Sequence, residues 1–244
     1  MITQLTASSR FLIARLPAIA GLLVISAALA QQQGPDARTR YERAMRIGHE
    51  LCIAGRFEES FALWDAAQKA NPASAEPIAW RCHAFHELGE DDRALPECNR
   101  ALTRDPRLAI AYRFRGEISF ELDENAAALA DLSRAVSLDP NDFEAWALRA
   151  FTFRKMRRRE EALADINRAL AIAPGQPDLL IVRSMIYREG SEFDQAEADL
   201  RQALDIEPRS RRAWEQYVML RRAMQDEAGA RKAEQILEQM RQGR

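Results

Sequence analysis

The sequence has no excess of charge of one sign: 35 Lys and Arg stand against 37 Asp and Glu, a formal net charge of -2. A nucleic-acid-binding protein usually presents a concentrated basic surface, and this balance gives no global reason to expect one. The chain also lacks a Gly-rich phosphate loop, a dinucleotide fingerprint and a serine nucleophile elbow. We therefore expect neither a nucleic-acid partner nor an enzyme.

Histidine is scarce, with three in the whole chain. His49 and His86 each begin a His-Glu sequence like that of a zinc protease. The second histidine of that motif is replaced by Ile53 in one case and by Glu90 in the other. Neither helix then presents two histidines on one face, which excludes a zinc-protease site.

Long apolar runs are also missing. Leu16 to Ala30 is uncharged and mostly apolar, but it is shorter than the roughly 18 residues expected of a membrane-spanning helix. Arg10 and Arg15 precede it without any acidic residue, and it ends in small residues. A basic segment, an apolar segment and a small-residue end are the order typical of a secretory signal peptide.

We therefore predict that residues 1–30 are a signal peptide and that the mature protein begins at Gln31, in the periplasm or outside the cell. Retention of residues 11–30 as a membrane anchor is the alternative. Residues 31–40 are predicted to form a polar linker, because Gly34 and Pro35 disfavour a helix there.

The rest of the chain repeats with a period of 34 residues. Five prolines stand in register: Pro72, Pro106, Pro140, Pro174 and Pro208. Small residues also recur at this period, and large apolar residues fill the positions between them at spacings of three and four. That spacing in both halves of a unit predicts two amphipathic helices, the second ended by the proline.

Residues 41–244 hold six such units. They are residues 41–74, 75–108, 109–142, 143–176, 177–210 and 211–244, and the last is the least regular. The spacing, the small-residue positions and the helix-ending proline resemble the tetratricopeptide repeat family. The resemblance implies an all-α, right-handed superhelical solenoid of helix-turn-helix repeats, in which stacking supplies the core and the last unit is a cap.

Two charged positions share the period and predict a ladder of ion pairs between packed helices. Arginine recurs in the first helix and Asp or Glu in the second. The pairs are Arg81 with Glu97, Arg115 with Asp131, Arg149 with Asp165, and Arg183 with Asp199. We interpret these pairs as structural, because half-buried pairs add modest stability and fix helix register.

The N-terminal repeats offer a candidate metal site. His49 and Cys52 lie three apart, and His83 and His86 repeat that spacing one unit later. Residues three apart share a helical face, so the four side chains are candidates to bind zinc or copper. The alternative is that they line a recognition groove and that the protein needs no cofactor.

The remaining cysteines, Cys82 and Cys98, take core-facing positions in the two helices of one unit. An exported protein meets an oxidising compartment, and antiparallel packing brings the two helices close, so a disulfide is one prediction. Two buried free thiols are the other. Cys52 is unpaired in either case.

The C-terminal repeats carry a candidate binding groove. An apolar residue stands three before an arginine in three successive units, which places the two side by side. The six residues are Phe151, Arg154, Met185, Arg188, Met219 and Arg222. They predict an apolar stripe edged by guanidinium groups, suited to a partner peptide or protein with acidic groups. The alternative is that these arginines pair with neighbours such as Glu189.

The only dense basic run, Arg154 to Arg159, falls at a predicted helix-to-helix turn. It is either a solvated turn or a point of peripheral contact with anionic lipid or an acidic partner. Taken together, the sequence predicts a non-catalytic protein-interaction scaffold or adaptor of the cell envelope. A metal-binding or metallochaperone protein that uses the N-terminal histidines is the second hypothesis.

Overall fold

The computed structural model describes residues 36–242, and over this range the chain forms twelve helices and no strand. In chain order the helices are α2 (Ala37–Ile53), α3 (Phe57–Ala70), α4 (Glu76–Glu87), α5 (Asp91–Arg104), α6 (Ala109–Glu121), α7 (Asn125–Leu138), α8 (Phe143–Lys155), α9 (Arg159–Ile172), α10 (Pro177–Glu189), α11 (Phe193–Ile206), α12 (Arg211–Ala223) and α13 (Glu227–Arg241). The protein is an all-α helical-repeat solenoid, as the resemblance to the repeat family implies.

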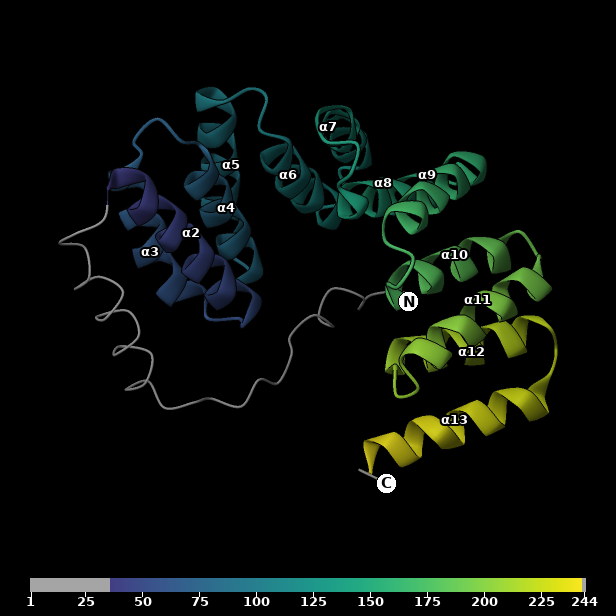
Figure 1. Ribbon diagram of the computed structural model, residues 1–244. Coiled ribbons are helices and arrows are strands. Elements are labelled where there is room, and N and C mark those ends of the chain that lie inside the picture. The colour runs from purple at the N-terminus through teal and green to yellow at the C-terminus, as the bar shows by residue number, and fades with distance from the viewer. Residues whose placement is uncertain (1–35, 243–244) are drawn as a thin grey trace. The chain divides into compact units, whose positions relative to one another are not determined.

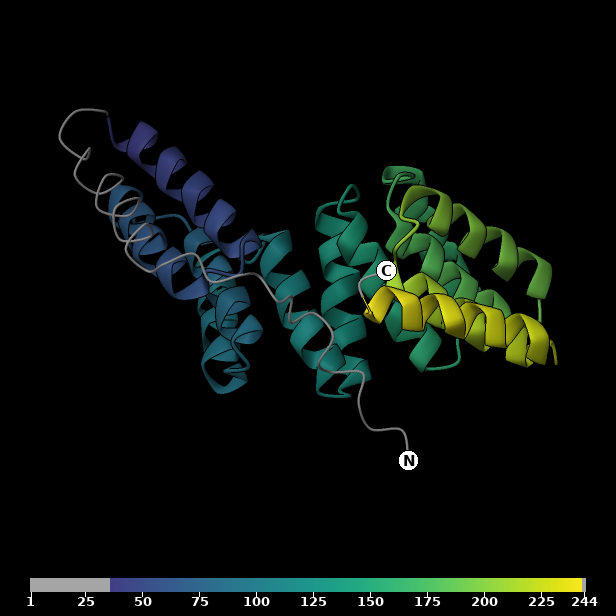
Figure 2. The same ribbon diagram turned by 90° about the horizontal axis from the view of Figure 1, so that it is seen from below.

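The helices group into two compact units, which we call unit 1 and unit 2. Unit 1 holds α2 to α7 and ends at Leu138, and unit 2 begins at Asp139 and holds α8 to α13. Within each unit, consecutive helices form antiparallel pairs joined by short turns (Figure 1). Figure 2 shows the same pairs from below. Each predicted repeat therefore contributes one helix pair, and each unit stacks three pairs.

The first helix begins earlier than the sequence predicts. Asp36 caps α2 with a side-chain oxygen that accepts a hydrogen bond from the Thr39 amide at 2.8 Å. Such a cap satisfies one of the free amides of the first turn. The predicted linker over residues 31–40 is therefore wrong from Ala37 onward, because those residues form the first turn of α2.

The second helix of a repeat ends two residues before its proline. The residue preceding a proline is disfavoured in helical conformation. At Asn71, Asp105, Ala173 and Glu207, φ lies between -134° and -129° and ψ between 71° and 97°. The periodic prolines thus set the place where each of these helices stops.

The turn inside every repeat uses one residue with positive φ. The residues share the 34-residue period and have φ between 59° and 76°: Gly55, Gly89, Asp123, Arg157, Ser191 and Gln225. This left-handed conformation suits glycine, and other residues adopt it at a cost. Only unit 1 places glycine there.

Close helix approach depends on small residues. Gly116 of α6 faces Leu132 of α7, and a Cβ added at Gly116 would lie 2.8 Å from the leucine Cγ. At the matching position of the first repeat, a Cβ at Gly48 would lie 2.5 Å from Trp64 Nε1. The second helices contribute alanines that are fully buried, such as Ala101 and Ala135. The pairs α2–α3 and α6–α7 therefore close over a glycine that faces a large side chain.

Between residues 36 and 242, no helix is long and apolar enough to cross a membrane. The predicted signal peptide, residues 1–30, and the alternative anchor, residues 11–30, lie outside the described residues.

Candidate functional site

The predicted ladder of ion pairs forms in three successive repeats. In each of them, the pair joins the first helix of the repeat to the second. Arg115 donates two hydrogen bonds of 2.7 Å to Asp131, and Arg183 donates bonds of 2.8 and 2.6 Å to Asp199. Arg149 binds Asp165 in the same bidentate way, at 2.6 and 2.9 Å. These arginines are occupied by their partners, which supports their structural interpretation.

The first pair of the ladder is looser. Arg81 lies 3.9 Å from Glu97, and its guanidinium also binds Asp65. In the same repeat, Cys82 and Cys98 form a disulfide, with Cα atoms 5.3 Å apart, and both residues are fully buried. Cys52 is a buried free cysteine.

The six predicted groove residues of unit 2 lie on the first helices of its repeats, and we call them the Arg–Met stripe. Phe151 and Arg154 belong to α8, Met185 and Arg188 to α10, and Met219 and Arg222 to α12. Met219 is 47% exposed, whereas Met185 is half-buried. The structure thus places one apolar residue and one arginine on each of three successive first helices.

The three arginines of the stripe differ in their partners. Arg154 forms an ion pair with Glu189 and lies 5.7 Å from the centre of the Phe151 ring. Arg222 forms an ion pair with Glu234 of α13. Arg188 makes no hydrogen bond or ion pair with any residue in the range 36–242. Burial lowers the pKa of its guanidinium, the nearby charge of Glu189 opposes that shift, and the charge of Arg154 adds to it. Two arginines are therefore paired, as the alternative interpretation holds, and one is available.

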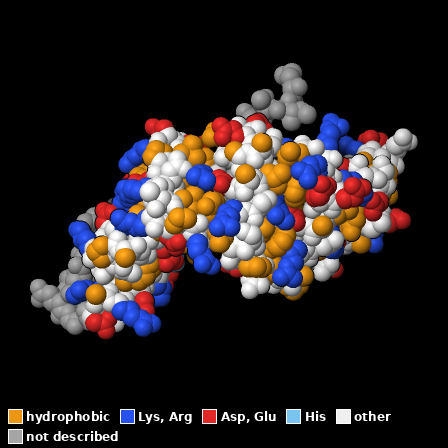
Figure 3. Space-filling view, turned by 90° about the horizontal axis from the view of Figure 1, so that it is seen from above, with side chains coloured by type: hydrophobic (Ala, Val, Ile, Leu, Met, Phe, Trp, Pro, Cys, Tyr) orange, Lys and Arg blue, Asp and Glu red, His pale blue; other side chains and the backbone are white. Residues whose placement is uncertain are grey.

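The basic run is largely neutralised within unit 2. Arg158 pairs with Glu161 at 2.8 Å and lies over the Phe153 ring, and Arg159 pairs with Glu192. Figure 3 shows one face of the molecule, on which basic, acidic and apolar side chains are all exposed. These contacts favour a solvated turn.

In unit 1 the positions that match the apolar residues of the stripe hold His49, His83 and Glu117, and the two histidines belong to an aromatic cluster. The His83 ring stacks on Phe114, with centroids 4.5 Å apart, and Trp80 packs edge-on against both rings. His49 extends the cluster, with its ring 4.2 Å from Trp80. We call these four residues the histidine cluster, and it joins the first helices α2, α4 and α6.

The predicted metal ligands do not converge. His49 and His83 pack against aromatic rings, whereas His86 Nδ1 lies 2.7 Å from Asp91 in another direction. The Cys52 thiol is buried, which raises its pKa to about 12 and disfavours the thiolate that a metal binds. Among residues 36–242, no three His, Cys, Asp or Glu side chains are grouped to hold a metal ion. The metal hypothesis is therefore not supported, because packing turns the four side chains apart.

Burial and neighbouring charges together shift the pKa values of three groups in unit 1. Burial, aided by Arg113 and His86, lowers the pKa of His83 to about 3, so this histidine is neutral at physiological pH. Burial raises the pKa of Glu117 to about 7, although Arg113 and His86 oppose the shift. For His86, burial acts to lower the pKa, but the hydrogen bond to Asp91 and the charges of Glu117 and Glu121 outweigh it and raise it.

Comparison with known proteins identifies the repeat. The model described as "Tetratricopeptide repeat" matches residues 143–176 and 177–210, which are two of the six predicted units. By sequence, residues 143–210 of the chain are two tetratricopeptide repeats. The chain's helix pairs, its small-residue positions and its helix-ending prolines agree with that assignment. No curated protein matches the chain significantly.

Solved structures show the same tetratricopeptide fold at low sequence identity. PilF of Pseudomonas aeruginosa is 18% identical, covers 85% of this chain and 95% of its own, and has a TM-score of 0.71. PilW, a type IV pilus biogenesis factor, is 16% identical, covers 81% and 92%, and also has a TM-score of 0.71. YrrB, a TPR protein with an unusual peptide-binding site, is 20% identical, covers 78% and 95%, and has a TM-score of 0.52.

Sequence reasoning missed two features of this protein. One is the pair Arg113 and Glu117, which accompanies the histidine cluster on α6. The other is a pocket in the last repeat, beside Tyr217 and Ala233. Its signal is visible in the sequence, because these two residues stand where the ladder arginine and aspartate are due.

Proposed function

We propose that this protein is an exported scaffold of the cell envelope that binds a partner polypeptide along the Arg–Met stripe of unit 2. Tetratricopeptide proteins are protein–protein interaction scaffolds, and the stripe gives this one a chemically defined surface. It joins apolar contact area to a cation, the combination that an extended peptide with an acidic side chain needs.

Arg188 carries the proposal. A cation that is partly removed from water loses hydration, and within a protein it usually regains that free energy from a carboxylate. Arg154 and Arg222 have such partners in Glu189 and Glu234, but Arg188 has none within residues 36–242. A carboxylate of the partner would complete the site, in a bidentate pair that is worth about 1.5–3 kcal/mol.

The apolar residues of the stripe supply adaptable contact area. Met219 is 47% exposed and Met185 is half-buried beside Arg188. Methionine side chains are flexible and polarisable, so the same surface fits more than one side-chain shape. A peptide-binding site in the similar structure YrrB agrees with this use of the fold.

The envelope location rests on the N-terminal sequence. Arg10, Arg15 and the apolar run to Ala30 have the order of a secretory signal. The similar structure PilW is a type IV pilus biogenesis factor, which agrees with an envelope role. N-terminal sequencing of the protein isolated from its native cells tests export, and we expect Gln31 as the first residue. A mature chain that still begins at Met1 would contradict cleavage.

Site-specific photo-crosslinking in native cells tests the stripe. A photoreactive amino acid at Met219 is expected to capture a partner, whereas the same group at Gln202, an exposed residue of α11 outside the stripe, captures little. Mass spectrometry of the adduct then identifies the crosslinked peptide. Equal adducts from both positions would contradict the proposal.

Two substitutions at Arg188 sharpen the test. Arg188→Glu reverses the charge and is expected to weaken partner binding by about 10- to 100-fold. Arg188→Lys keeps the charge but loses the bidentate geometry, so an intermediate loss is expected. Purified protein and the synthetic partner peptide give these affinities by calorimetry. Unchanged affinity in Arg188→Glu would remove the stripe as the binding site.

A further inference from the structure

The ladder of ion pairs stops at the last repeat. Where the earlier repeats have Arg115, Arg149 and Arg183, the last repeat has Tyr217. Where they have Asp131, Asp165 and Asp199, it has Ala233. The hydroxyl of Tyr217 donates instead to Glu197 of α11, at 2.9 Å. The space that a bidentate pair fills in the earlier repeats is therefore left open between α12 and α13.

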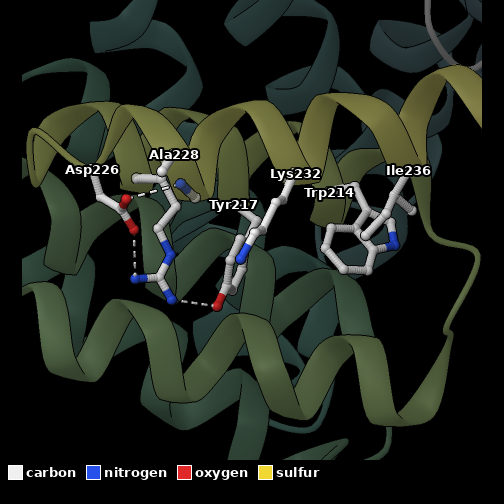
Figure 4. Close-up of a pocket in the computed structure, with 9 residues that line it drawn as sticks. Trp214, Tyr217, Asp226, Ala228, Lys232 and Ile236 are labelled. Atoms are coloured by element: carbon white, nitrogen blue, oxygen red, sulfur yellow. Dashed lines mark hydrogen bonds and ion pairs between the residues drawn. The ribbon is translucent and has the colours of Figure 1, made fainter.

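This space is a pocket of about 310 Å³, which we call the terminal pocket. Figure 4 shows its residues, with Lys232 and Ile236 projecting from α13 toward Tyr217 and Trp214 of α12. Its lining residues are Trp214, Tyr217, Arg221, Asp226, Ala228, Gly229, Lys232, Ala233 and Ile236. Its size is at the lower end of the range of small-ligand sites, which is enough for one side chain of a partner.

The walls of the terminal pocket favour an aromatic ring. Trp214 and Tyr217 meet edge to face, with ring centroids 5.7 Å apart, and Ile236 and Ala233 complete the apolar lining. The indole N–H of Trp214 is occupied by the Pro208 carbonyl at 3.1 Å, so the ring offers its apolar surface. Aromatic pairs in this arrangement gain free energy beyond the area that they bury.

Two cationic side chains line the terminal pocket, and only one of them is paired. Arg221 is neutralised by Glu197 at 2.6 Å and by Asp226 at 3.4 Å. Lys232 has no hydrogen bond or ion pair among the described residues. It is also one of only three lysines in the chain, and the earlier repeats have Ala130, Ala164 and Ala198 at its position. The unpaired ammonium is complementary to a carboxylate at the mouth of the pocket.

We propose that the terminal pocket is a second binding site, which takes an aromatic side chain next to an acidic side chain of a partner polypeptide. It is distinct from the Arg–Met stripe, because Tyr217 and Met219 are two residues apart on α12 and so point about 160° apart around its axis, toward nearly opposite sides of the helix. The inference therefore does not depend on the proposed function of the stripe.

Blocked dipeptides and the indole signals of the purified mature chain test the proposal. Acetyl-Glu-Phe-amide is expected to shift the Trp214 indole cross-peak saturably in a ¹H–¹⁵N spectrum, and the signals of Trp64, Trp80 and Trp146 act as internal controls. A Trp214→Phe variant assigns the cross-peak. We expect acetyl-Gln-Phe-amide to bind about 2- to 5-fold more weakly, as the loss of one exposed ion pair implies. Acetyl-Glu-Ala-amide is expected to lose about 10-fold or more of the affinity.

Two variants supply matched controls. Lys232→Ala installs the residue of the earlier repeats, and it should abolish the preference for the Glu dipeptide over the Gln dipeptide. Tyr217→Arg with Ala233→Asp restores the Arg183–Asp199 arrangement, and it should fill the pocket and abolish binding. Arg188→Glu should leave the dipeptide affinity unchanged, which separates this site from the stripe.

Three results would overturn the proposal. The first is the absence of a saturable shift at Trp214 in the unmodified chain. The second is equal affinity for the Glu and Gln dipeptides, and the third is undiminished binding by a folded Tyr217→Arg/Ala233→Asp variant. If that double variant does not fold, Lys232→Ala decides, because a preference for the Glu dipeptide that survives in it contradicts the assigned role of the lysine.

Discussion

The two units have the same repeat but place different chemistry at matching positions. One position of the first helix holds His49, His83 and Glu117 in unit 1, and Phe151, Met185 and Met219 in unit 2. Three residues later, unit 1 has Cys52, His86 and Phe120, whereas unit 2 has three arginines. Unit 1 therefore presents groups that titrate, and unit 2 presents apolar groups beside permanent cations.

The units also differ in how they close one helix pair. Cys82 and Cys98 occupy positions that hold Gly116 and Leu132 in the next repeat, and Ala150 and Ile166 in the first repeat of unit 2. The disulfide thus replaces a contact between a small and a large side chain that works elsewhere without a covalent link. The same pair of positions can therefore hold a disulfide or an apolar contact. A repeat closed by a disulfide depends for its stability on oxidising conditions.

The largest effect is expected from the disulfide. Cys82→Ser with Cys98→Ser should lower the free energy of unfolding of unit 1 by about 3 kcal/mol, because the bond closes a loop with a sequence separation of 16. Hydrogen exchange in denaturant, followed separately for peptides of each unit, measures the change. The matched control is Cys82→Ala with Cys98→Ile, which copies Ala150 and Ile166 and should recover part of the loss. Equal losses in units 1 and 2 would contradict a local role for the bond.

Acid lability is the next difference to test. The pKa of His83 is about 3 in the folded chain against an ordinary 6.5, so the unfolded chain binds a proton that the folded chain does not. Stability is therefore lost as the pH falls from about 6.5 toward 3. His83→Phe copies Phe151 of unit 2 and should stabilise unit 1 at pH 5 by about 2 kcal/mol relative to its effect at pH 8.

Denaturant unfolding at pH 5 and pH 8 gives that difference. Glu117 acts in the opposite direction, since its raised pKa of about 7 makes stability fall as the pH rises from about 4.5 to 7. Comparing variant and unmodified protein at each pH cancels the contributions of Glu117 and His86. A stability difference that does not change with pH would show that His83 is not buried as a neutral ring.

A smaller effect is expected at the turn of unit 1. Gly89 has φ 76°, so Gly89→Ala should lower the free energy of unfolding by about 1–2 kcal/mol. Gly175 is the matched control, because it lies in a loop with no atom within 4 Å of an added Cβ and does not have positive φ. Gly175→Ala should be neutral or slightly stabilising in thermal unfolding. Similar losses at both positions would contradict this account.

The smallest effect is the converse change in unit 2. Gln225 has φ 60° at the turn position where unit 1 has glycine twice. Gln225→Gly should stabilise unit 2 by about 0.5 kcal/mol, because relief of left-handed strain is partly offset by the greater chain entropy of glycine. Thermal unfolding detects this as a small rise in Tm. A fall in Tm would mean that the Gln225 side chain stabilises the turn.

Much of this structure was predictable because the fold is local and periodic. Each proline in register disfavours helical conformation for the residue before it, and the second helix stops there. Arg149 and Asp165 share the period and meet as predicted, because packed helix pairs keep the same register in every repeat. The start of α2 was misplaced, since Asp36 caps it outside the periodic part.

The candidate sites were less predictable, because they depend on side-chain contacts. His49, Cys52, His83 and His86 have a spacing that fits a metal site, but aromatic rings and Asp91 provide other partners for three of them. The six residues of the stripe lie on α8, α10 and α12, and nothing in the repeat distinguishes Arg188 from Arg154 or Arg222. The three arginines differ because Glu189 forms an ion pair with Arg154 and Glu234 forms one with Arg222.

The sequence by itself determined the number of helix pairs, the ends of most second helices and the partners in the ladder, because backbone sterics and periodic small residues act over a few residues. Only the tertiary structure decided which buried polar groups are paired and how Glu117 and His83 titrate. These properties depend on which atoms of neighbouring helices exclude water from a given side chain, and a linear pattern does not contain that information.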